Sequence, residues 1–527
     1  MTEEPTLLYF PDLIEYQART RGDKPFILFE DRVITFAEFD KMTCRAANGL
    51  KAQGAQPGDG IAILMGNCPE FLFIYHGVPR AGFYTVPVNA SLKGEGLRYI
   101  LSHSDVKYIA VDDVLYPEIE KLGRPLGAIK KIFVRTTTGA APQKGTEDLS
   151  VLFDAPADKP EYEMKIGAIN YILYTSGTTG FPKGVVFRNY PGVVQYMKTT
   201  ISAWVNPDDI LYTCLPLFHG NALQLTTTWA MCAGVPMALD KRFSASRIWD
   251  TIRRYGCTEF NALGAMIPIL MKQPEKPNDA DNPVRLVMSA ACPANLWEAF
   301  EKRFGVKIWE GYGAVDGAGG MTNFGNAPVG SVGKPAAGIE WKLVDDAGNE
   351  VPQGQVGEFV TLVPEGRPRV EYYKDAKSSA EKVRGGWHHS GDLFYADKEG
   401  NLYFVDRKSD FMRRRGENIS SFEVENIVEK HPAVAECAAF GVPSELGEDE
   451  VMLWVRVKPG MELNLKDLIQ HCAKNMAYFM VPRYIDIVDD IPRTETMRVK
   501  KGDMKKRGVT KRTWDREKEM PDLKLKK

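Results

Sequence analysis

The chain has 527 residues, of which 44% are hydrophobic and 26% charged, a composition typical of ordinary globular proteins. A single hydrophobic core rarely serves a chain of this length, so we expect two or more domains. With 67 Lys and Arg against 69 Asp and Glu, the net charge is −2, which gives no electrostatic reason to expect a nucleic-acid partner.

The N-terminal residues predict neither export nor a membrane anchor, because they begin acidic and lack a basic segment followed by an apolar run. The most apolar stretch, 71–88, is interrupted by His76, Pro79, Arg80 and Pro87, whereas a transmembrane helix needs about 20 predominantly apolar residues. The eight cysteines are scattered without a C-x-x-C pair, which disfavours disulfides or a zinc site and favours a reducing compartment. We therefore expect a cytoplasmic protein without a transmembrane segment and leave peripheral membrane contact open.

Short β-branched or aromatic runs alternate with helical segments over about the first 400 residues. We expect an amphipathic helix at 36–52 and strands at 60–65, 107–111, 131–134 and 170–174, each strand bounded by turn residues. This alternation predicts α/β layers with largely parallel sheets.

Near residue 405 the pattern changes, and 406–416 form a dense charged stretch. After it we expect one helix and two strands, at 421–430, 436–442 and 451–457. A compact α+β domain of about 120 residues would fit this remainder. We therefore predict a large domain at 1–407 and a small domain at 408–527.

The C-terminal stretch from Arg493 onwards has 14 Lys and Arg against six Asp and Glu. It is either a solvated, fraying end or a basic segment that approaches phosphates. The sequence leaves both interpretations open.

The stretch with the most chemical information is Tyr-Thr-Ser-Gly-Thr-Thr-Gly-Phe-Pro-Lys-Gly at 174–184, directly after an apolar strand. Its glycines allow backbone N–H groups to approach an anion, and its hydroxyl residues add donors. Lys183 supplies a movable positive charge for a triphosphate. An ordinary P-loop has Gly-Lys-Ser/Thr opening a helix, whereas Lys183 lies between Pro182 and Gly184. We interpret the stretch as a phosphate loop of another class, with a generic Ser/Thr/Gly turn as the alternative.

These residues resemble the phosphate loop of the adenylate-forming superfamily, which includes acyl-CoA synthetases, luciferases and peptide-synthetase adenylation domains. Four further segments resemble family motifs in the same order along nearly the whole chain. Residues 216–219 resemble the substrate gate, and 310–316 resemble the adenine and magnesium segment. Residues 390–392 resemble the ribose-binding aspartate motif, and 406–407 the start of the interdomain hinge. The tripeptide Ser-Gly-Asp at 390–392 would be too short to indicate a family by itself, but the motifs together, in the family's order, are strong evidence.

The resemblance implies an α/β fold: a large N-terminal domain of stacked αβ layers with mixed sheets and a small β-barrel-like subdomain, plus a small mobile α+β C-terminal domain. It implies a ligase that uses ATP and Mg²⁺ to form an acyl-adenylate from a carboxylic acid, and then passes the acyl group to coenzyme A. The stretches 216–274 and 508–516 are most similar to the crotonobetaine/carnitine-CoA ligase-like and fatty-acyl-CoA synthetase branch, which favours CoA over a carrier protein as acceptor. We expect a monomer or a homodimer.

By this resemblance, the phosphate loop would hold the β- and γ-phosphates of ATP. The loop residues concerned are Thr175, Ser176, Gly177, Thr178, Thr179, Gly180 and Lys183. Asp316 would hold magnesium together with the phosphates, since this hard ion prefers carboxylate and phosphate oxygens. His219 would gate the site near the acid's carboxylate, or it is simply a satisfied buried histidine.

The adenosine part of ATP would be bound by the two later motifs. Tyr312 would pack on the adenine, and Asp392 would accept hydrogen bonds from the ribose hydroxyls, although a core tyrosine and a turn-capping aspartate are the alternatives. The remaining predicted contacts to the cofactors come from Glu310, Gly311, Gly313, Val315, Arg407 and Gly416. Gly416 ends the cationic run 413–416, which would meet the CoA phosphates or would be a solvated charge run.

Three positions depart from the family's pattern. Arg498, the fourth predicted catalytic residue beside Lys183, His219 and Asp316, stands where the family has a lysine that contacts the forming acyl-adenylate. Arginine is longer, planar and forked, so we predict either slow adenylation or a re-accommodated side chain. Val315 removes a hydroxyl that could bond phosphate, a loss of about 1 kcal/mol, and Asp316 shortens the usual carboxylate. At the hinge, a serine at 409 can still absorb the backbone change of a rotating domain.

The acyl pocket is expected from four stretches rich in Gly and Ala: 218–225, 261–266, 289–293 and 314–321. Small lining residues favour a medium-chain, long-chain or bulky apolar acid, or they merely allow tight packing. Two other functions stay open. One is a degenerate homologue that binds nucleotide or acyl-AMP with little turnover, prompted by Arg498 and Val315, and the other is an acyl-AMP ligase that loads a carrier protein.

Overall fold

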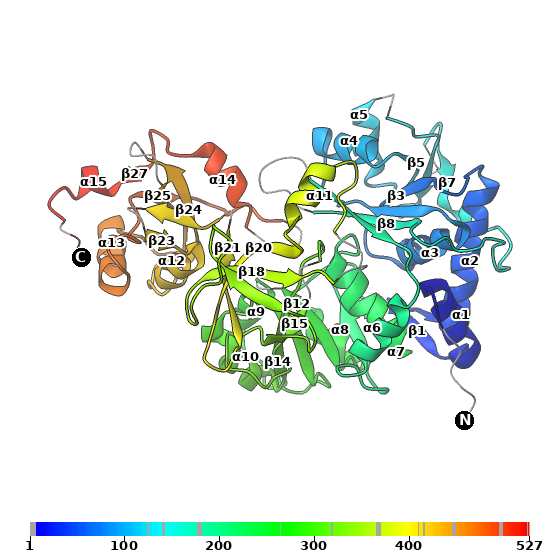
Figure 1. Cartoon of the computed structure of the whole chain (residues 1–527), viewed down its shortest axis with the longest axis horizontal. Helices are drawn as coiled ribbons and strands as arrows, with labels where there is room; N and C mark the ends of the chain where they lie inside the picture. Colours follow the sequence, from blue (N-terminus) through cyan, green and yellow to red (C-terminus); the bar gives the residue numbers. More distant parts are fainter. Residues whose placement is uncertain are drawn as a thin grey trace. The chain divides into compact units, whose positions relative to one another are not determined.

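The computed structural model describes most of the chain. The described residues are 7–123, 126–139, 143–175, 182–263, 265–317, 320–364, 370–408, 410–414, 417–444, 449–494, 499–523 and 525. The chain forms two compact units (Figure 1), of which the first comprises Met1–Glu310 and Pro368–Lys382 and the second Gly311–Arg367 and Val383–Lys527. None of the helices within the described ranges is both long and apolar enough to cross a membrane.

The first unit contains a seven-stranded sheet in the order β7-β6-β5-β3-β4-β8-β9. Its strands are β3 (Gly60–Leu64), β4 (Tyr84–Pro87), β5 (Val106–Asp112), β6 (Lys131–Arg135), β7 (Glu147–Asp148), β8 (Ile169–Tyr174) and β9 (Gly184–Arg188). All neighbouring pairs are parallel except β8 and β9. The α/β layers and the four strands predicted from the sequence are therefore confirmed.

Helices α4 (Gly94–His103) and α5 (Tyr116–Leu122) cover one face of this sheet, and Leu97, Ile100 and Ile119 join its core cluster. Helix α2 (Phe36–Ala52) has the predicted bounds. It begins at Thr35, whose hydroxyl accepts a hydrogen bond from the backbone N–H of Glu38, and this cap satisfies one of the helix's open donors.

A second sheet of this unit consists of the strands β2, β1, β11, β10, β12, β13 and β14, in that order. Their bounds are β1 (Pro25–Phe29), β2 (Arg32–Thr35), β10 (Leu211–Thr213), β11 (Met237–Leu239), β12 (Glu259–Leu263), β13 (Leu286–Ala290) and β14 (Lys307–Tyr312). The chain passes from the first unit to the second within β14. Further helices of the first unit are α1 (Phe10–Arg21), α3 (Pro69–Gly77), α6 (Val193–Ile201), η3 (Asn221–Thr228), α7 (Trp229–Ala233), α8 (Ile248–Tyr255), α9 (Met266–Met271), α10 (Ala294–Phe304) and α11 (Ala376–Lys382).

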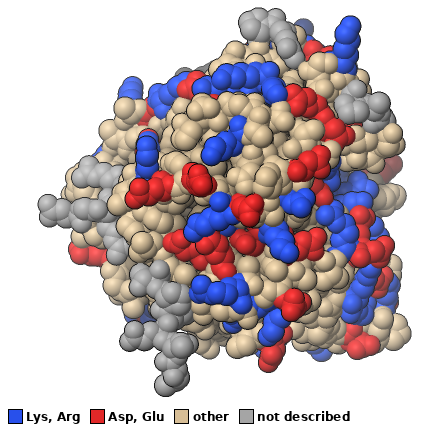
Figure 2. All heavy atoms as spheres, turned by 90° about the vertical axis from the view of Figure 1, so that its right-hand side faces the viewer, with Lys and Arg blue, Asp and Glu red and all other residues tan. Residues whose placement is uncertain are grey.

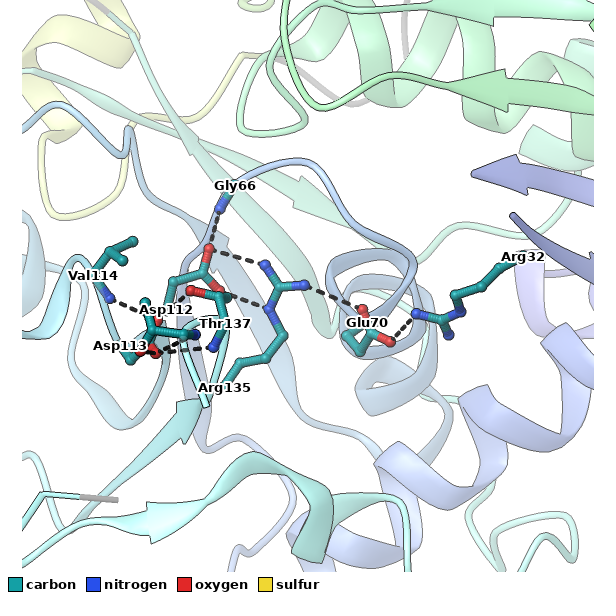
Figure 3. Close-up of polar contacts among 9 residues, drawn as sticks. Arg32, Gly66, Glu70, Asp112, Asp113, Val114, Arg135 and Thr137 are labelled. Carbon is teal, nitrogen blue, oxygen red and sulfur yellow. Dashed lines mark hydrogen bonds and ion pairs between the residues drawn. The ribbon is translucent and has the colours of Figure 1, made fainter. Parts of the chain in front are cut away.

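The seven-stranded sheet reverses its strand order between β3 and β5, and ligands of open α/β sheets often bind outside the carboxyl ends of the strands at such a point. Here an ion-pair network occupies that edge (Figure 3). Arg135 forms ion pairs with Asp112 (2.7 Å) and with Glu70 (3.4 Å), and Asp112 also accepts a hydrogen bond from the backbone N–H of Gly66. Arg32 extends the network to Glu70 over 2.7 Å. These groups satisfy one another, so we assign the network to stability.

Positive and negative side chains are intermingled on the face shown in Figure 2. This pattern agrees with the net charge of −2. On this face the two signs are mixed and do not form the single-sign patch that attracts nucleic acids.

The second unit contains an antiparallel sheet of β17 (Trp341–Val344), β18 (Gly357–Leu362), β19 (Val383–Arg384), β20 (Trp387–Ala396) and β21 (Leu402–Arg407). Phe359, Phe394 and Leu402 form its core with Met321 and Leu343. This sheet occupies the place of the expected β-barrel-like subdomain. The short strand β15 (Met321–Thr322) pairs with the end of β14, and β16 (Lys334–Pro335) pairs with β15.

The C-terminal α+β region has the mixed sheet β24 (Val434–Pro443), β25 (Asp449–Val457), β26 (Tyr484–Ile487) and β27 (Trp514–Asp515). Its further elements are the hairpin β22 (Met412–Arg414) and β23 (Glu417–Ile419) and the helices α12 (Ser421–Val428), α13 (Leu465–Asn475), α14 (Lys501–Arg507) and α15 (Arg516–Glu519). The predicted helix and both strands are confirmed, and the helix ends two residues earlier than expected. The division between 407 and 408 stays a prediction.

Candidate functional site

The phosphate loop connects β8 to β9, and its tip at 176–181 lies outside the described residues. That range includes Ser176, Gly177, Thr178, Thr179 and Gly180, so their predicted contacts are not placed. The base of the loop is closed, because the backbone N–H of Thr175 donates to the carbonyl of Lys183 over 2.9 Å. Gly184 is required by packing, since a Cβ there would lie 2.8 Å from the Ile172 side chain.

Lys183 is exposed at this base and reaches the segment at 370–382, which belongs to the same unit. Its Nζ donates to the hydroxyl of Ser378 in α11 over 2.7 Å and lies 5.2 Å from the ring centroid of Tyr372. These two contacts are with neutral groups, and Lys183 also lowers the pKa of the Asp375 carboxyl group electrostatically. No sequence motif indicated this anchor, because Ser378 follows Lys183 by 195 residues.

His103 is a neighbour of the loop that sequence reasoning missed. Its Nδ1 forms a 2.8 Å hydrogen bond with the hydroxyl of Tyr174, the residue just before Thr175, and its ring stacks on Tyr99 at 4.9 Å. Burial, helped by the nearby Lys374, lowers the pKa of His103. The imidazole is therefore neutral at pH 7 and positions the strand that leads into the loop.

His219 follows β10 and precedes η3. Its Nε2 is buried and has no hydrogen-bond partner among the described residues, which favours the predicted gate over the alternative of a satisfied buried histidine. Burial lowers the pKa of His219 to about 4. The side chain is consequently a neutral polar group at pH 7, which suits a gate and excludes a resident positive charge.

Glu310 braces the loop after β13. Its buried carboxylate accepts hydrogen bonds from the backbone N–H groups of Ala291 and Cys292, and Ala291 has a left-handed φ of 68°. Burial raises the pKa of Glu310 to about 7. Glu310, a predicted cofactor-binding residue, thus supports the loop at 289–293. This loop holds Ala291 in a backbone conformation that L-residues seldom adopt.

In the second unit, Tyr312, Asp392 and Arg407 come together. The Tyr312 hydroxyl donates to Oδ2 of Asp392 over 2.7 Å, and Nε of Arg407 lies 3.7 Å from Oδ1. Asp392 and Arg407 are register partners on β20 and β21. Gly391, with a φ of 77°, permits the turn of the backbone just before Asp392.

The Tyr312 ring packs edge-on against Phe394, with ring centroids 4.9 Å apart. Burial and the adjacent Asp392 carboxylate raise the pKa of its phenol, so the hydroxyl stays protonated and donates. The ring of Tyr312 is therefore partly core, and its hydroxyl orients the aspartate, while packing of the ring on the adenine stays a prediction. Gly311 and Gly313 flank it, and Gly313 is exposed.

Asp316 lies in the same unit, and its carbonyl oxygen accepts a hydrogen bond from Nε2 of His388 over 2.9 Å. The described part of the chain contains no group of three or more His, Cys, Asp or Glu side chains that could hold a metal ion. A single carboxylate is an adequate protein ligand for magnesium when phosphate oxygens supply the others. Asp316 fits that limited role, and Val315 beside it contributes no hydroxyl.

The hinge region is held from both sides, although Ser409, Arg415 and Gly416 lie outside the described residues. Lys408 forms ion pairs with Asp346 (2.9 Å) and Glu358 (3.0 Å). Arg414 is 2% exposed, pairs with Glu450 over 2.8 Å and donates to the carbonyl of Phe479. It is therefore part of the C-terminal core and is unsuited to the predicted contact with CoA phosphates.

Arg498 also lies outside the described residues, at 495–498. The ends of this loop are joined, because Arg493 bridges to Val499 and the backbone N–H of Lys500 donates to the carbonyl of Pro492 over 2.8 Å. Lys501 is turned into the core, where it pairs with Glu425 over 2.8 Å. Lys501 therefore cannot stand in for the lysine that Arg498 replaces.

Comparison with known proteins gives matches along most of the chain. A family model described as AMP-binding enzyme matches residues 14–364, and one described as AMP-binding enzyme C-terminal domain matches residues 423–498. The crotonobetaine/carnitine–CoA ligase of Salmonella paratyphi B is 30% identical over 508 residues, which cover 92% of this chain and 96% of that protein. The ligase of the same name from Citrobacter koseri is 29% identical, with 93% and 97% covered.

Solved structures share the fold. The anthranilate CoA ligase AuaEII in complex with anthranoyl-AMP superposes with a TM-score of 0.84 at 25% identity, covering 96% of this chain and 98% of that one. The o-succinylbenzoate CoA synthetase MenE of Bacillus subtilis, in complex with ATP and magnesium ion, gives a TM-score of 0.77 at 26% identity, covering 94% and 99%.

Proposed function

Because the chain belongs to the AMP-binding enzyme family and is an AMP-forming acid–CoA ligase, we propose that its acid is mainly apolar and either bulky or of medium to long chain. In the first step a carboxylate oxygen attacks the α-phosphorus of ATP, and the bond to the pyrophosphate oxygen breaks. In the second step the CoA thiol loses its proton and attacks the acyl carbon, and AMP leaves. The protein mainly positions the reactants and neutralises their charge.

Lys183 supplies charge to the phosphates of ATP, and the assignment depends on one observation. It donates a hydrogen bond to a neutral hydroxyl and lies over a ring face, and the Asp375 carboxylate interacts with it electrostatically. A lysine whose hydrogen bond goes to a neutral hydroxyl can exchange it for a phosphate, and the charged hydrogen bond it gains is the stronger one. The hydroxyl and glycine residues 175–180 supply further donors to the same phosphates.

Asp392 receives the ribose hydroxyls, oriented by Tyr312 and flanked by Arg407, while Gly311 and Gly313 admit the adenine. Bound magnesium would offset phosphate charge, and Asp316 is the protein carboxylate we assign to it. His219, neutral at pH 7, lies at the acid's carboxylate and admits it without retaining it as a counter-ion. Gly416 belongs to the part of the chain that we assign to CoA.

The acid substrate follows from the small residues in the stretches at 261–266 and 289–293, which leave room for an apolar chain. We place the reaction in the cytoplasm, and the eight unpaired, buried cysteines support a reducing compartment.

ATP–pyrophosphate exchange over a panel of carboxylic acids tests this function. The expected result is acid-dependent exchange with medium-chain, long-chain or bulky apolar acids, followed by a thioester when CoA is added. Exchange without thioester formation, together with acylation of a carrier protein, would overturn CoA as acceptor.

A second candidate is a homologue that binds nucleotide or acyl-AMP with little turnover. It is favoured by Arg498 in place of lysine and by Val315, which offers no hydroxyl to phosphate. Retention of ATP by the purified protein, with no exchange for any acid, would establish this alternative instead.

A further inference from the structure

Three polar side chains near the start of η3 have buried atoms that lack a hydrogen-bond partner within the described ranges. They are Nε2 of His219 and the Oδ1 atoms of Asn221 and Asn261. Asn261 is 2% exposed. Buried polar atoms in folded proteins are nearly always paired, so a group of three in one region requires an explanation.

The three residues lie in or next to η3 and the strand β12, which contacts it. In the π-helix η3, a residue bonds to the fifth one along, so Thr226 lies about one turn beyond Asn221. Asn261, on the neighbouring strand β12, donates its Nδ2 to the hydroxyl of Thr226 over 2.6 Å. Asn261 therefore contacts η3 about one turn from Asn221, and His219 is two residues before Asn221.

Neighbouring polar groups of the same helix are satisfied within it. The hydroxyl of Thr227 donates to the carbonyl of Ala222 over 3.1 Å, and that of Thr228 donates to the carbonyl of Leu223 over 2.9 Å. The unpaired atoms of His219, Asn221 and Asn261 belong to stretches that the sequence assigns to the acyl pocket, 218–225 and 261–266. Ser289 on the neighbouring strand β13, in a further such stretch, and Glu259 on β12 also have a buried oxygen without a partner among the described residues.

The chemistry of these side chains selects the kind of group they can bind. Burial lowers the pKa of His219 to about 4, and the amides carry no charge. The nearest carboxyl group along β12 is Glu259, whose pKa burial and the nearby Asp209 raise to about 8, so it too is mainly neutral at pH 7. A cationic group would have no ionised carboxylate beside it here, and a second carboxylate on the substrate would face amide oxygens. A hydroxyl, by contrast, can donate to an amide oxygen and accept from an imidazole N–H.

We propose that the acid activated by this protein carries a hydroxyl group on its otherwise apolar chain, and that Asn261 and Asn221 bind this hydroxyl. The proposal rests on the proposed function and narrows its substrate class. A site built to bond a hydroxyl discriminates strongly against the analogue without it, because the buried polar groups are then left unpaired.

The test compares matched acids. The ATP–pyrophosphate exchange rate is measured for straight-chain acids and for the same acids with a hydroxyl at successive positions along the chain. For one position of the hydroxyl, kcat/KM should exceed that of the unsubstituted acid of the same length by about 10- to 100-fold. If exchange is robust but unsubstituted acids react equally well or better at every position, the hydroxyl proposal is overturned while the ligase function stands.

Variants locate the effect. Asn261→Leu and Asn221→Leu should each reduce the preference for the hydroxylated acid to within about threefold, and Asn278→Leu, at an exposed position of the same unit, should leave it unchanged. Asn261→Leu also removes the hydrogen bond to Thr226, so its thermal unfolding is measured to detect a folding defect. If such a defect is found, the result for Asn221→Leu decides whether the hydroxyl is bound here. An unchanged preference in a folded Asn221→Leu protein contradicts the assignment.

Should no acid support exchange, binding of paired acyl-sulfamoyl adenosines, with and without the hydroxyl, is measured by calorimetry. Tighter binding of the hydroxylated analogue supports the inference even without turnover. Equal binding, or none, overturns it.

Discussion

The phenol of Tyr312 donates a hydrogen bond to Oδ2 of Asp392 over 2.7 Å, although 80 residues separate them in the chain. Tyr312 ends β14, and Asp392 lies within β20. On the other side of the carboxylate, Arg407 approaches from β21. The aspartate is therefore held in one orientation before a ribose arrives, and a preorganised group gives up less freedom on binding.

Replacing Tyr312 with phenylalanine should raise the KM for ATP about 10-fold, because a hydrogen bond to a charged group contributes about 1.5–3 kcal/mol and part of it is kept by Arg407. Exchange kinetics at saturating acid measure the effect. Tyr395→Phe, at an exposed position of β20, the strand that contains Asp392, is the control and should behave as the unaltered protein. An unchanged KM would show that the hydroxyl does not orient Asp392 for ATP.

Lys183→Met should lower kcat/KM for adenylation about 100- to 1,000-fold, since it removes a positive charge from the phosphates in the transition state. Ser378→Ala should stay within about threefold, because the phosphate takes over the place of the serine hydroxyl. Lys377→Met, which changes an exposed lysine next to Ser378, is the matched control. A larger loss with Ser378→Ala than with Lys183→Met would assign the phosphate contact to α11.

Arg498→Lys should speed adenylation if arginine is a poor substitute for one compact ammonium group. Single-turnover formation of acyl-AMP separates this step from thioester formation. A gain of about 10-fold, or about 1.4 kcal/mol, would be a clear result. An equal or lower rate would mean that the rest of the site has adapted to arginine, and Arg498→Met should then abolish the step.

Glu259 should make the protein less stable as pH rises. Burial and the nearby Asp209 raise its pKa from 4.5 to about 8, so between these values the unfolded chain releases a proton that the folded protein keeps. The free energy of unfolding then falls with increasing pH by at most about 1.4 kcal/mol per pH unit. Glu310, whose pKa burial raises to about 7, acts in the same direction.

Glu259→Gln removes the ionisation and should reduce the loss of thermal stability between pH 5 and pH 8, leaving the part that is due to Glu310. Melting temperatures at the two pH values measure this difference. Glu298→Gln, at an exposed position of α10, serves as the control. Equal pH dependence of Glu259→Gln and the unaltered protein would show that Glu259 is ionised in the folded state.

The network in Figure 3 should contribute to stability unevenly. Asp112→Asn should cost about 2–3 kcal/mol, less than the about 3–5 kcal/mol of a fully buried pair, because the Arg135 side chain is 23% exposed. Arg32→Met should cost under about 1 kcal/mol, since the Arg32 side chain is 49% exposed. Urea unfolding compares the two. Equal costs would mean that solvent screens both ion pairs alike.

Much of the architecture could be predicted from the amino-acid order. Parallel strands such as β3 and β5 are continuous apolar runs because both faces of the strand are buried. The helix at 36–52 has its predicted bounds because a threonine cap and an amphipathic period mark them locally. The phosphate loop is equally local, since its glycines, hydroxyls and lysine are consecutive. Motifs of this kind are visible without any knowledge of what packs against them.

Tertiary structure alone decided which groups meet. Strand register brings Asp392 to Arg407, and a segment 195 residues away gives Lys183 its neutral partner. The charged run at 413–416 reads as solvent-facing, yet Arg414 is buried against Glu450, because side-chain direction in a hairpin depends on the sheet behind it. The unpaired amide oxygens of Asn221 and Asn261 are also invisible in the sequence, since satisfaction of a buried polar atom depends on neighbours that only folding supplies.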